Sequence, residues 1–296
     1  MERIKVNLDI QSSEDILNEM YQEYLSCPKA IAYLHKLGLS DDIVKENIAK
    51  IYDFVSDLKY CANCPGVDNC KKENPLLITK VTYNGKYLDR EIIPCKKFLQ
   101  RVEFQNQFVM RDFDESYLKV KISGLDKNEK RAPAVNKYLQ YTKNKIGEWI
   151  YLIGAQNTGR SFLAAVFARD AAEKKLGPIA FLNCSKRINE LTDLYFKNKD
   201  RFKEQLEMLS NIPILVLDDF GNEMKNDVVR DAIVFPILST RASKKLFTII
   251  TSDFSIPDIV NLYSTSKPGE IRAKQIGNIL KAASGKEINL GDLAIY

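Results

Sequence analysis

Apolar positions in the first sixty residues recur at helical spacing. Ser12 can cap a helix whose apolar positions fall four residues apart. Pro28 suits the first turn of a second helix, and Gly38 suits its end. A third, longer helix is predicted to begin at Ser40, with one apolar stripe formed by Val44, Ile48, Ile51, Val55 and Leu58. Such a stripe faces either its own core or a partner, and we expect core packing because amphipathic helices of globular domains normally bury that face.

The pattern then changes from helical to alternating. Two β-prone runs, 76–83 and 87–93, are joined by an Asn-Gly pair, which is the strongest short signal for a β-hairpin. The following stretch, 105–135, is rich in polar and charged residues and is predicted to be a linker. We therefore expect a small helical domain over residues 1–104.

Apolar runs and helical patterns alternate over residues 136–296. A helix over 161–175 follows the first predicted strand and ends before a Gly-Pro pair. The predicted strands are 149–153, 179–182, 212–217 and 246–251. This alternation is typical of an α/β domain, in which helices cover a mostly parallel sheet.

Composition limits the class of protein. The 296 residues are 45% hydrophobic, as in globular proteins, and no apolar run reaches the ~18 residues that a membrane span needs. The N-terminus lacks the apolar core of a secretory signal, so we expect a cytoplasmic protein without membrane contact. The net charge of +5 permits contact with nucleic acid but does not require it.

Four of the six cysteines lie close together in the sequence. Cys61 and Cys64 have the short spacing of a zinc knuckle, Cys70 follows a Pro-Gly turn, and Cys95 ends the predicted hairpin. If the hairpin folds back, the four thiolates can complete a closed tetrahedral site, whose role would be structural. Unpaired buried thiols are the alternative, and clustering in a reducing compartment favours zinc.

A glycine-containing loop follows the first strand of the α/β domain. Residues 154–161 match the phosphate-loop pattern, except that Arg160 stands in the lysine position. Backbone N–H groups of such a loop surround a phosphate, and the Ser161 hydroxyl can hold Mg²⁺. The residues predicted to bind ATP or ADP are Gly154, Asn157, Thr158, Gly159, Arg160 and Ser161.

Two carboxylates follow the third predicted strand. An acidic pair after a buried strand is how phosphate-loop folds place acid beside the metal, so Asp218 is predicted to hold Mg²⁺ through water and Asp219 to orient the attacking water. Helix capping is the simpler explanation for a single Asp, but it fits a pair poorly. Arg160 is larger and more planar than lysine, so we expect it to permit binding while misplacing the γ-phosphate for hydrolysis.

These motifs occur together in one known family. The cysteine cluster, the phosphate loop, Leu-Asp-Asp-Phe-Gly-Asn-Glu at 217–223 and Thr-Ser-Asp-Phe-Ser at 251–255 follow one another in the order seen in helicase loaders of the DnaI and DnaC type. The chain resembles that family over nearly its whole length, most strongly over 148–255. The resemblance implies an AAA+ domain preceded by a zinc-containing domain that binds the hexameric replicative helicase for delivery to single-stranded DNA. It also places Asp253 at a polar sensor position.

Several family positions are changed in this chain. A loop glycine is Asn157, the loop lysine is Arg160, and Gln275 stands where the family carries an arginine finger. Arg272 lies nearby, although each residue along a helix turns the side-chain direction by about 100°. Because these groups read the γ-phosphate, we expect a loader that retains helicase binding and nucleotide binding with weakened hydrolysis.

Other functions remain open from the sequence. An ordinary ATP-hydrolysing loader fits if Arg160 and Arg272 serve adequately, and a non-hydrolysing AAA+ scaffold that bridges the helicase and other replication proteins fits if they do not. The ATPase subunit of a transposase shares the AAA+ core, but the cysteine module argues against it. Single-stranded DNA is a further candidate partner through Arg241, Lys244 and Lys245, which equally fit a solvated turn. Self-association on the helicase ring is also a candidate.

Overall fold

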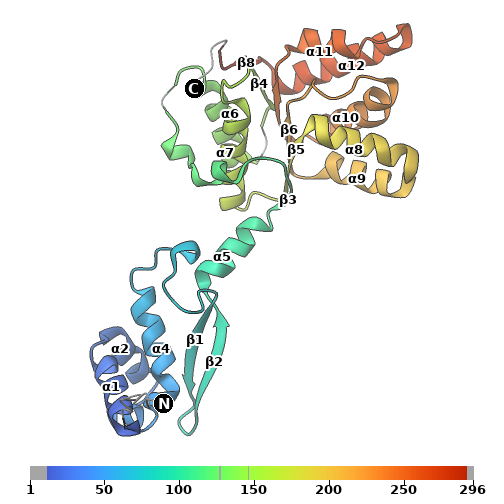
Figure 1. Ribbon diagram of the computed structural model, residues 1–296. Helices are drawn as coiled ribbons and strands as arrows, with labels where there is room; N and C mark the ends of the chain where they lie inside the picture. Colours follow the sequence, from blue (N-terminus) through green and yellow to red (C-terminus); the bar gives the residue numbers. More distant parts are fainter. Residues whose placement is uncertain (1–11, 127, 146, 292–296) are drawn as a thin grey trace, which may run out of the picture. The chain divides into compact units, whose positions relative to one another are not determined.

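The computed structural model describes residues 12–126, 128–145 and 147–291 (Figure 1). It divides the chain into two compact units, Met1–Val102 (unit 1) and Glu103–Tyr296 (unit 2). Within the described ranges, no helix combines the length and the apolar character needed to cross a membrane.

Unit 1 is a group of helices packed with a β-hairpin. Its elements are α1 (Ser13–Leu25), α2 (Pro28–Lys36), α3 (Asp41–Glu46), α4 (Ile48–Cys61), β1 (Leu77–Tyr83) and β2 (Leu88–Pro94), with α5 (Lys96–Gln105) running across its boundary. The predicted cap is present, because the Ser12 hydroxyl accepts a hydrogen bond of 3.2 Å from the Asp15 backbone N–H. The third predicted helix is two helices, since Asn47 leaves helical geometry at φ −109° and separates α3 from α4.

The apolar stripe of α3 and α4 faces the core of unit 1. Val44, Ile48, Ile51 and Val55 are buried there together with Val81 of the hairpin. This confirms the packing interpretation of the stripe. On α1, by contrast, Ile16 and Leu17 remain 40% and 41% exposed.

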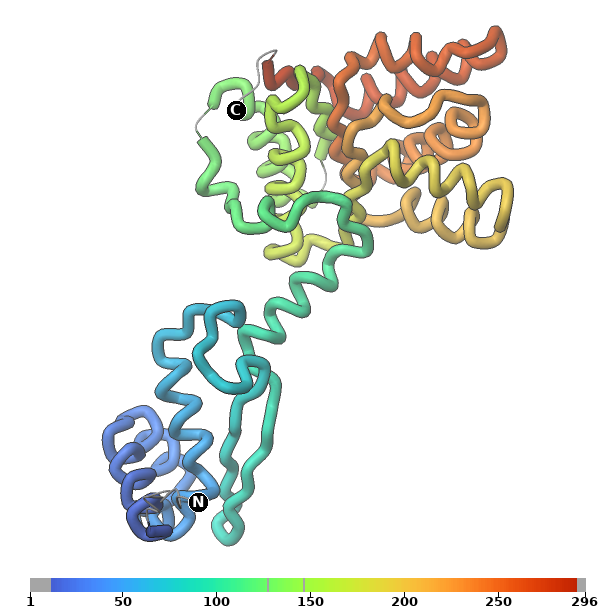
Figure 2. Tube along the Cα trace, viewed as in Figure 1, coloured from blue at the N-terminus to red at the C-terminus, as the bar shows by residue number. Residues whose placement is uncertain are grey.

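The hairpin forms where the Asn-Gly signal predicts it. Asn84 accepts backbone hydrogen bonds from Lys86 and Tyr87, and Gly85 takes a left-handed φ of 88°. The strands pair antiparallel from Leu77↔Pro94 to Tyr83↔Leu88. Asp57 of α4 accepts a 2.6 Å hydrogen bond from the Thr79 N–H, which fixes the hairpin alongside that helix (Figure 2).

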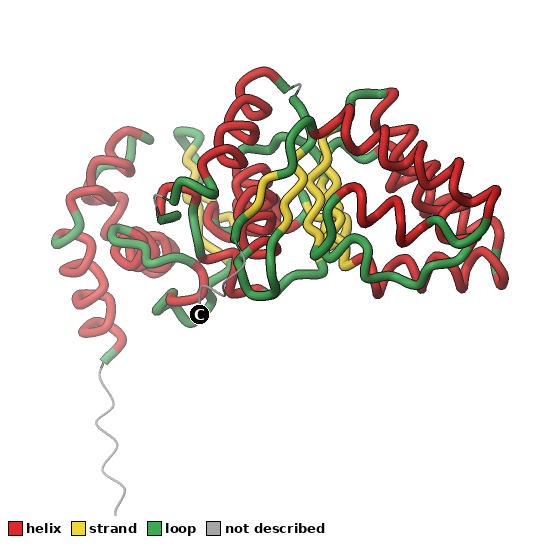
Figure 3. Tube along the Cα trace, turned by 90° about the horizontal axis from the view of Figure 1, so that it is seen from above, coloured by secondary structure: helices red, strands yellow, loops and turns green. Residues whose placement is uncertain are grey.

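Unit 2 is built on a parallel sheet of strand order β3-β5-β6-β7-β4-β8. The strands are β3 (Phe108–Arg111), β4 (Ile150–Ile153), β5 (Ile179–Asn183), β6 (Ile214–Asp218), β7 (Phe247–Ser252) and β8 (Ile288–Asn289). The helices are α6 (Ala132–Asn144), α7 (Arg160–Glu173), α8 (Cys184–Lys197), α9 (Lys199–Asn211), the π-helix Val228–Val234, α10 (Phe235–Ser243), α11 (Ile256–Tyr263) and α12 (Lys267–Ser284). The sheet lies between helical layers (Figure 3).

Alternate side chains of each strand enter two separate cores. Ile150, Leu152 and Val216 pack in one core with α6 and α7, while Tyr151 and Leu217 pack in the other with helices from α8 to α12. Because successive side chains of a strand point to opposite faces, two covered faces require nearly continuous apolar strands. The predicted α/β class and its four strands are confirmed, and β3 and β8 were not predicted.

The segment 105–135, predicted as a linker, instead contributes to unit 2. Its strand β3 pairs with β5, and Phe113 packs edge-on to Phe181 at a centroid distance of 4.7 Å. Short 3₁₀ turns over Glu115–Lys119 and Ile122–Gly124 follow. The polar and charged composition of this segment suggested a linker, and it does not reveal that a short strand and a few aromatic side chains join the segment to unit 2.

Arg241 has a structural role that excludes it from a DNA-binding surface. Its side chain is fully buried and donates to the carbonyls of Leu209, Ile212 and Phe247 and to the Thr248 hydroxyl, at 2.6–3.0 Å. Burial lowers the pKa of this guanidinium. The predicted basic cluster with Lys244 and Lys245 is therefore wrong for Arg241, because spacing alone does not distinguish a buried arginine from an exposed one.

We expect Arg241→Ala to lower the free energy of unfolding of unit 2 by about 3 kcal/mol or more, because it leaves several buried carbonyls without donors. Urea unfolding can be followed by the fluorescence of Trp149, the single tryptophan of the chain, which is buried in unit 2. The control is Lys244→Ala at a surface position, for which we expect a change within about 0.5 kcal/mol. Equal effects of the two changes would contradict the structural role.

Candidate nucleotide site

A pocket of about 280 Å³ opens at the start of α7. It is lined by Tyr117, Gln156, Asn157, Gly159, Arg160, Ser161, Phe162, Asp219, Asn222 and Asp253. The phosphate loop follows β4, Asp219 follows β6, and Asp253 follows β7. Because these three strands are parallel neighbours, their carboxyl ends meet at one edge of the sheet and bring the predicted residues together.

The phosphate loop has the backbone conformation that its pattern predicts. Gly159 is left-handed at φ 84°, and Asn157 is left-handed at φ 62°, a conformation that Asn tolerates better than most residues. Thr158 is fully buried and its hydroxyl donates to the Ala155 carbonyl at 2.8 Å, so its side chain shapes the loop rather than the pocket. Helix α7 then begins at Arg160, and the N-terminus of a helix favours an anion.

The residues that follow β8 support the phosphate loop through backbone contacts. Gly154 approaches Gly291 so closely that a Cβ at position 154 would lie 2.9 Å from the Gly291 carbonyl oxygen. The Ala155 N–H donates to that carbonyl at 3.0 Å, and the Leu290 N–H donates to the Ile153 carbonyl at 2.8 Å. Gly154 therefore serves the close approach of two backbones.

Thr251 holds Asp218, the last residue of β6, and Asp219, which follows it. Its buried hydroxyl donates to Asp218 at 2.6 Å and accepts from the Asp219 N–H at 3.0 Å. Burial raises the pKa of Asp218 to about 6, against hydrogen bonds from Thr251 and Ser161 that lower it. Burial also raises the pKa of Asp219, whose backbone is held in a left-handed conformation at φ 56°.

Arg160 and Asp253 form an ion pair inside the pocket. Nη2 of Arg160 donates to Oδ1 of Asp253, and the Asn222 amide donates to the other carboxylate oxygen at 2.8 Å. Burial raises the pKa of Asp253, but the hydrogen bonds from Asn222 and Arg160 outweigh it and leave this pKa below its usual value. Nη1 of Arg160 is buried and has no hydrogen-bond partner among the described residues.

The residues present fit a phosphate and a magnesium ion. The unpartnered Nη1 is a donor without an acceptor, and a phosphate oxygen would satisfy it. Ser161 and Asp218 lie within hydrogen-bonding reach of each other and offer the oxygen ligands that Mg²⁺ prefers.

Three polar residues of the site were not predicted. Thr251 contacts Asp218 and Asp219, Asn183 donates to Asp219 at 3.3 Å, and Asn222 donates to Asp253. A usable signal was present for two of them, because Asn183 and Thr251 stand at the carboxyl ends of the strands on either side of β6.

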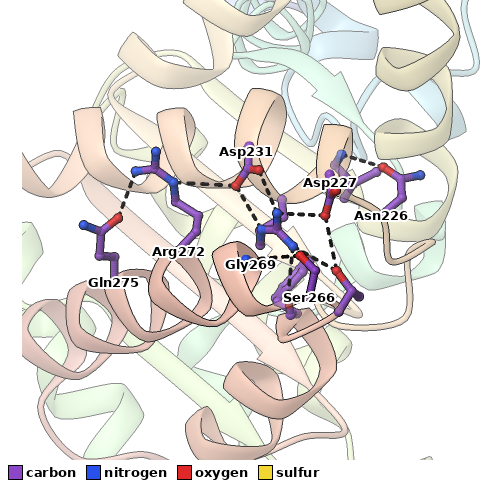
Figure 4. Close-up of polar contacts among 11 residues, drawn as sticks. Asn226, Asp227, Asp231, Ser266, Gly269, Arg272 and Gln275 are labelled. Atoms are coloured by element: carbon purple, nitrogen blue, oxygen red, sulfur yellow. Dashed lines mark hydrogen bonds and ion pairs between the residues drawn. The ribbon is translucent and has the colours of Figure 1, made fainter.

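Arg272 is bound to residues of its own chain. Its guanidinium lies 3.8 Å from the centroid of the Phe235 ring, 3.6 Å from the Asp231 carboxylate and 2.9 Å from the Gln275 side-chain oxygen (Figure 4). Asp231 also accepts two hydrogen bonds from the buried Arg230, at 2.9 and 2.7 Å. Arg272 and Gln275 thus share one hydrogen-bonded group on the surface of α12.

The predicted zinc site is not assembled in the structure. Cys61, Cys64, Cys70 and Cys95 are half-buried free thiols, and no group of three or more His, Cys, Asp or Glu side chains in the described part of the chain could hold a metal ion. Burial raises the pKa of Cys61, and Cys64 and Cys95 lie near enough to raise it further. Cys27 and Cys184 are buried free thiols elsewhere in the chain.

We expect Asp218→Asn to stabilise unit 2 by about 1–3 kcal/mol at pH 8, because a carboxyl with a folded pKa of about 6 is ionised there at the expense of the fold. The gain should shrink as pH falls through 6 and vanish below about pH 4, where the carboxyl is protonated in both the folded and the unfolded state. Unfolding monitored by Trp149 fluorescence across pH 4–8 measures it. A gain in stability that does not change with pH would contradict the raised pKa of Asp218.

Comparison with known proteins agrees with this geometry. Residues 94–264, more than half of the chain, match the family model of the IstB-like ATP binding protein. The replicative helicase loader DnaI of Bacillus subtilis (strain 168) is 24% identical over 240 residues, which cover 78% of this chain and 76% of that protein. A crystal structure of DnaI superposes with a TM-score of 0.55 at 22% identity, over 62% of this chain and 97% of that one, and shows a shared fold. The chain belongs to the family of IstB-like ATP binding proteins.

Proposed function

We propose that the chain is a loader of the replicative DNA helicase. It binds the helicase hexamer and delivers it to single-stranded DNA when replication starts or restarts, with a nucleotide held in unit 2. The observation that carries this proposal is the extent of the match to the Bacillus loader. It covers 78% of the chain, more than unit 2 alone can supply, so it reaches into unit 1. A shared ATP-binding domain by itself would not favour loading over the transposase-subunit alternative.

Unit 1 is the proposed helicase-binding part. Its α1 leaves Ile16, Leu17 and Leu25 between 40% and 43% exposed, although they are apolar. Exposed apolar side chains on a surface helix favour contact with a protein partner. Self-association of the chain on the helicase ring, and contact with single-stranded DNA through groups other than Arg241, are further parts of this proposal.

Unit 2 is the proposed site for ATP or ADP with Mg²⁺. Nη1 of Arg160 would contact a phosphate oxygen, Ser161 and Asp218 would hold the metal ion, and Asp219 would orient water. When bound, the metal ion would neutralise phosphate charge. Asp253 is paired with Arg160, the cationic side chain of the loop. This pairing supports weak hydrolysis, and it equally fits a non-hydrolysing scaffold.

We expect slow ATP turnover that single-stranded DNA does not stimulate, because the guanidinium of Arg160 is already paired with the Asp253 carboxylate and its charge is not free for the γ-phosphate. Arg160→Lys should raise the rate on the order of tenfold, since catalysis depends steeply on the position of the charge. Phosphate release measured with and without DNA tests this. Robust DNA-stimulated turnover of the unaltered protein, unchanged in Arg160→Lys, would support an ordinary ATP-hydrolysing loader instead.

A native mass spectrum of the chain mixed with the replicative helicase of the same cell tests the central proposal. We expect a helicase hexamer carrying subunits of this chain, because the likeness to the loader includes unit 1. Bound ADP or ATP would appear in the same spectrum. A helicase that stays bare would overturn the loader function.

The same spectrum tests the zinc proposal. Four cysteines between positions 61 and 95, of which Cys64 and Cys95 lie near enough to Cys61 to raise its pKa, support a structural Zn²⁺ that would draw them together. Each subunit should then be heavier than the bare chain by one zinc ion, and the paired change of Cys61 and Cys64 to serine should remove that mass. A chain of apo mass would leave these cysteines as free thiols.

A further inference from the structure

Asp253 brings a fixed negative charge into the nucleotide pocket. The pocket is also lined by Asp219, and Asp218 lies buried beside it. Against these carboxylates stands Arg160, the one cationic side chain among the described residues that line the pocket. The cavity is therefore acidic for a site that would receive phosphates.

The Asp253 carboxylate is held in place through both of its oxygens. One accepts from Arg160 and the other from Asn222. Asn222 follows a tight turn in which the Gly221 N–H donates to the buried Glu223 carboxylate at 2.9 Å. Gly221 has φ 96°, and a Cβ there would lie 2.6 Å from Ile259, so this turn has little room to move. The negative charge cannot easily swing away from an incoming anion.

The two terminal nitrogens of Arg160 have different surroundings. Nη2 is committed to Asp253, while Nη1 is buried without a partner. The free Nη1 can donate a hydrogen bond to an oxygen of an inner phosphate at the start of α7. The charge that would attract a further phosphate is already balanced by Asp253.

The direction of a bound phosphate chain follows from the order of the strands. The loop lies after β4, and Asp253 and Asp219 directly follow the neighbouring parallel strands β7 and β6. In a phosphate loop the inner phosphates lie in the loop, and the last one extends toward the metal and the acidic strand ends. A third phosphate must therefore approach the Asp253 carboxylate, whereas a second need not.

We propose that this pocket selects nucleoside diphosphates over triphosphates, with Asp253 as the residue that determines the selection. The inference rests on the proposed nucleotide site and names its ligand. Like charges brought together in a partly buried site repel strongly, so the third phosphate loses more by meeting Asp253 than it gains from the half-neutralised Arg160. The chain would then act mainly in its ADP-bound form.

Isothermal titration calorimetry of the full chain at a fixed excess of Mg²⁺ tests this, using ADP and β,γ-methylene ATP, which is not hydrolysed. We expect the unaltered protein to bind ADP more tightly by on the order of tenfold. Asp253→Asn should abolish or reverse the preference, mainly by tightening triphosphate binding, and Asp253→Glu should keep it. Asp193→Asn, which removes one exposed carboxylate from α8, is the matched control and should leave the ratio unchanged.

Equal affinities, or tighter triphosphate binding, in the unaltered protein would overturn the inference while leaving the nucleotide site intact. An unchanged ratio in a folded Asp253→Asn protein would overturn it as well, with folding checked through Trp149 fluorescence. If that variant unfolds, the ratio of ADP to triphosphate affinity in the unaltered protein and in Asp253→Glu decides whether the inference holds. Failure of both nucleotides to bind would remove the nucleotide site itself, and helicase capture in the mass spectrum would show separately whether the loader function survives.

Discussion

Parallel pairing of β6, β7 and β4 governs everything in the nucleotide site. Because the strands run in the same direction, the phosphate loop, the acidic pair and Asp253 all emerge at one edge although they are far apart in sequence. Thr251 then fixes the positions of the two acidic residues, since its hydroxyl donates to the carboxylate of Asp218 and accepts from the backbone N–H of Asp219. The two apolar cores on either side of the sheet keep this edge rigid.

The positive charge of this phosphate loop is already paired with a carboxylate, which the loop sequence alone does not suggest. A lysine in the loop would be a mobile point charge, whereas Arg160 is planar, buried and already paired. Arg160 and Asp253 act as a pair, because a buried guanidinium without a partner would be costly and the half-buried Asp253 carboxylate supplies that partner. The change from lysine to Arg160 therefore belongs to an interaction with Asp253, which the sequence alone does not show.

The sequence predicted those features that depend on a few neighbouring residues. The Asn-Gly pair specified the hairpin, the apolar runs specified four strands of unit 2, and the loop glycines specified the start of α7. The sequence could not show β3, because an edge strand of four residues needs its partner β5 to be recognisable. It could not show that Arg241 is buried, since its partners are carbonyls brought close by folding. The ligand geometry proposed for the cysteines likewise depends on loop packing that spacing does not encode, and the structure does not assemble it.

The brace behind the phosphate loop has a consequence for biosynthesis. The backbone at Gly154 and Ala155 is supported by Gly291, and β8 pairs with β4 only through Ile288 and Asn289. A chain that emerges from the ribosome therefore presents a complete phosphate-loop sequence long before the loop can take its final form. Domains fold largely as units during translation, and here the loop gains its support only when β8 and the residues directly after it have been synthesised. Nascent chains of this protein should consequently acquire nucleotide late, after almost all of unit 2 has been synthesised.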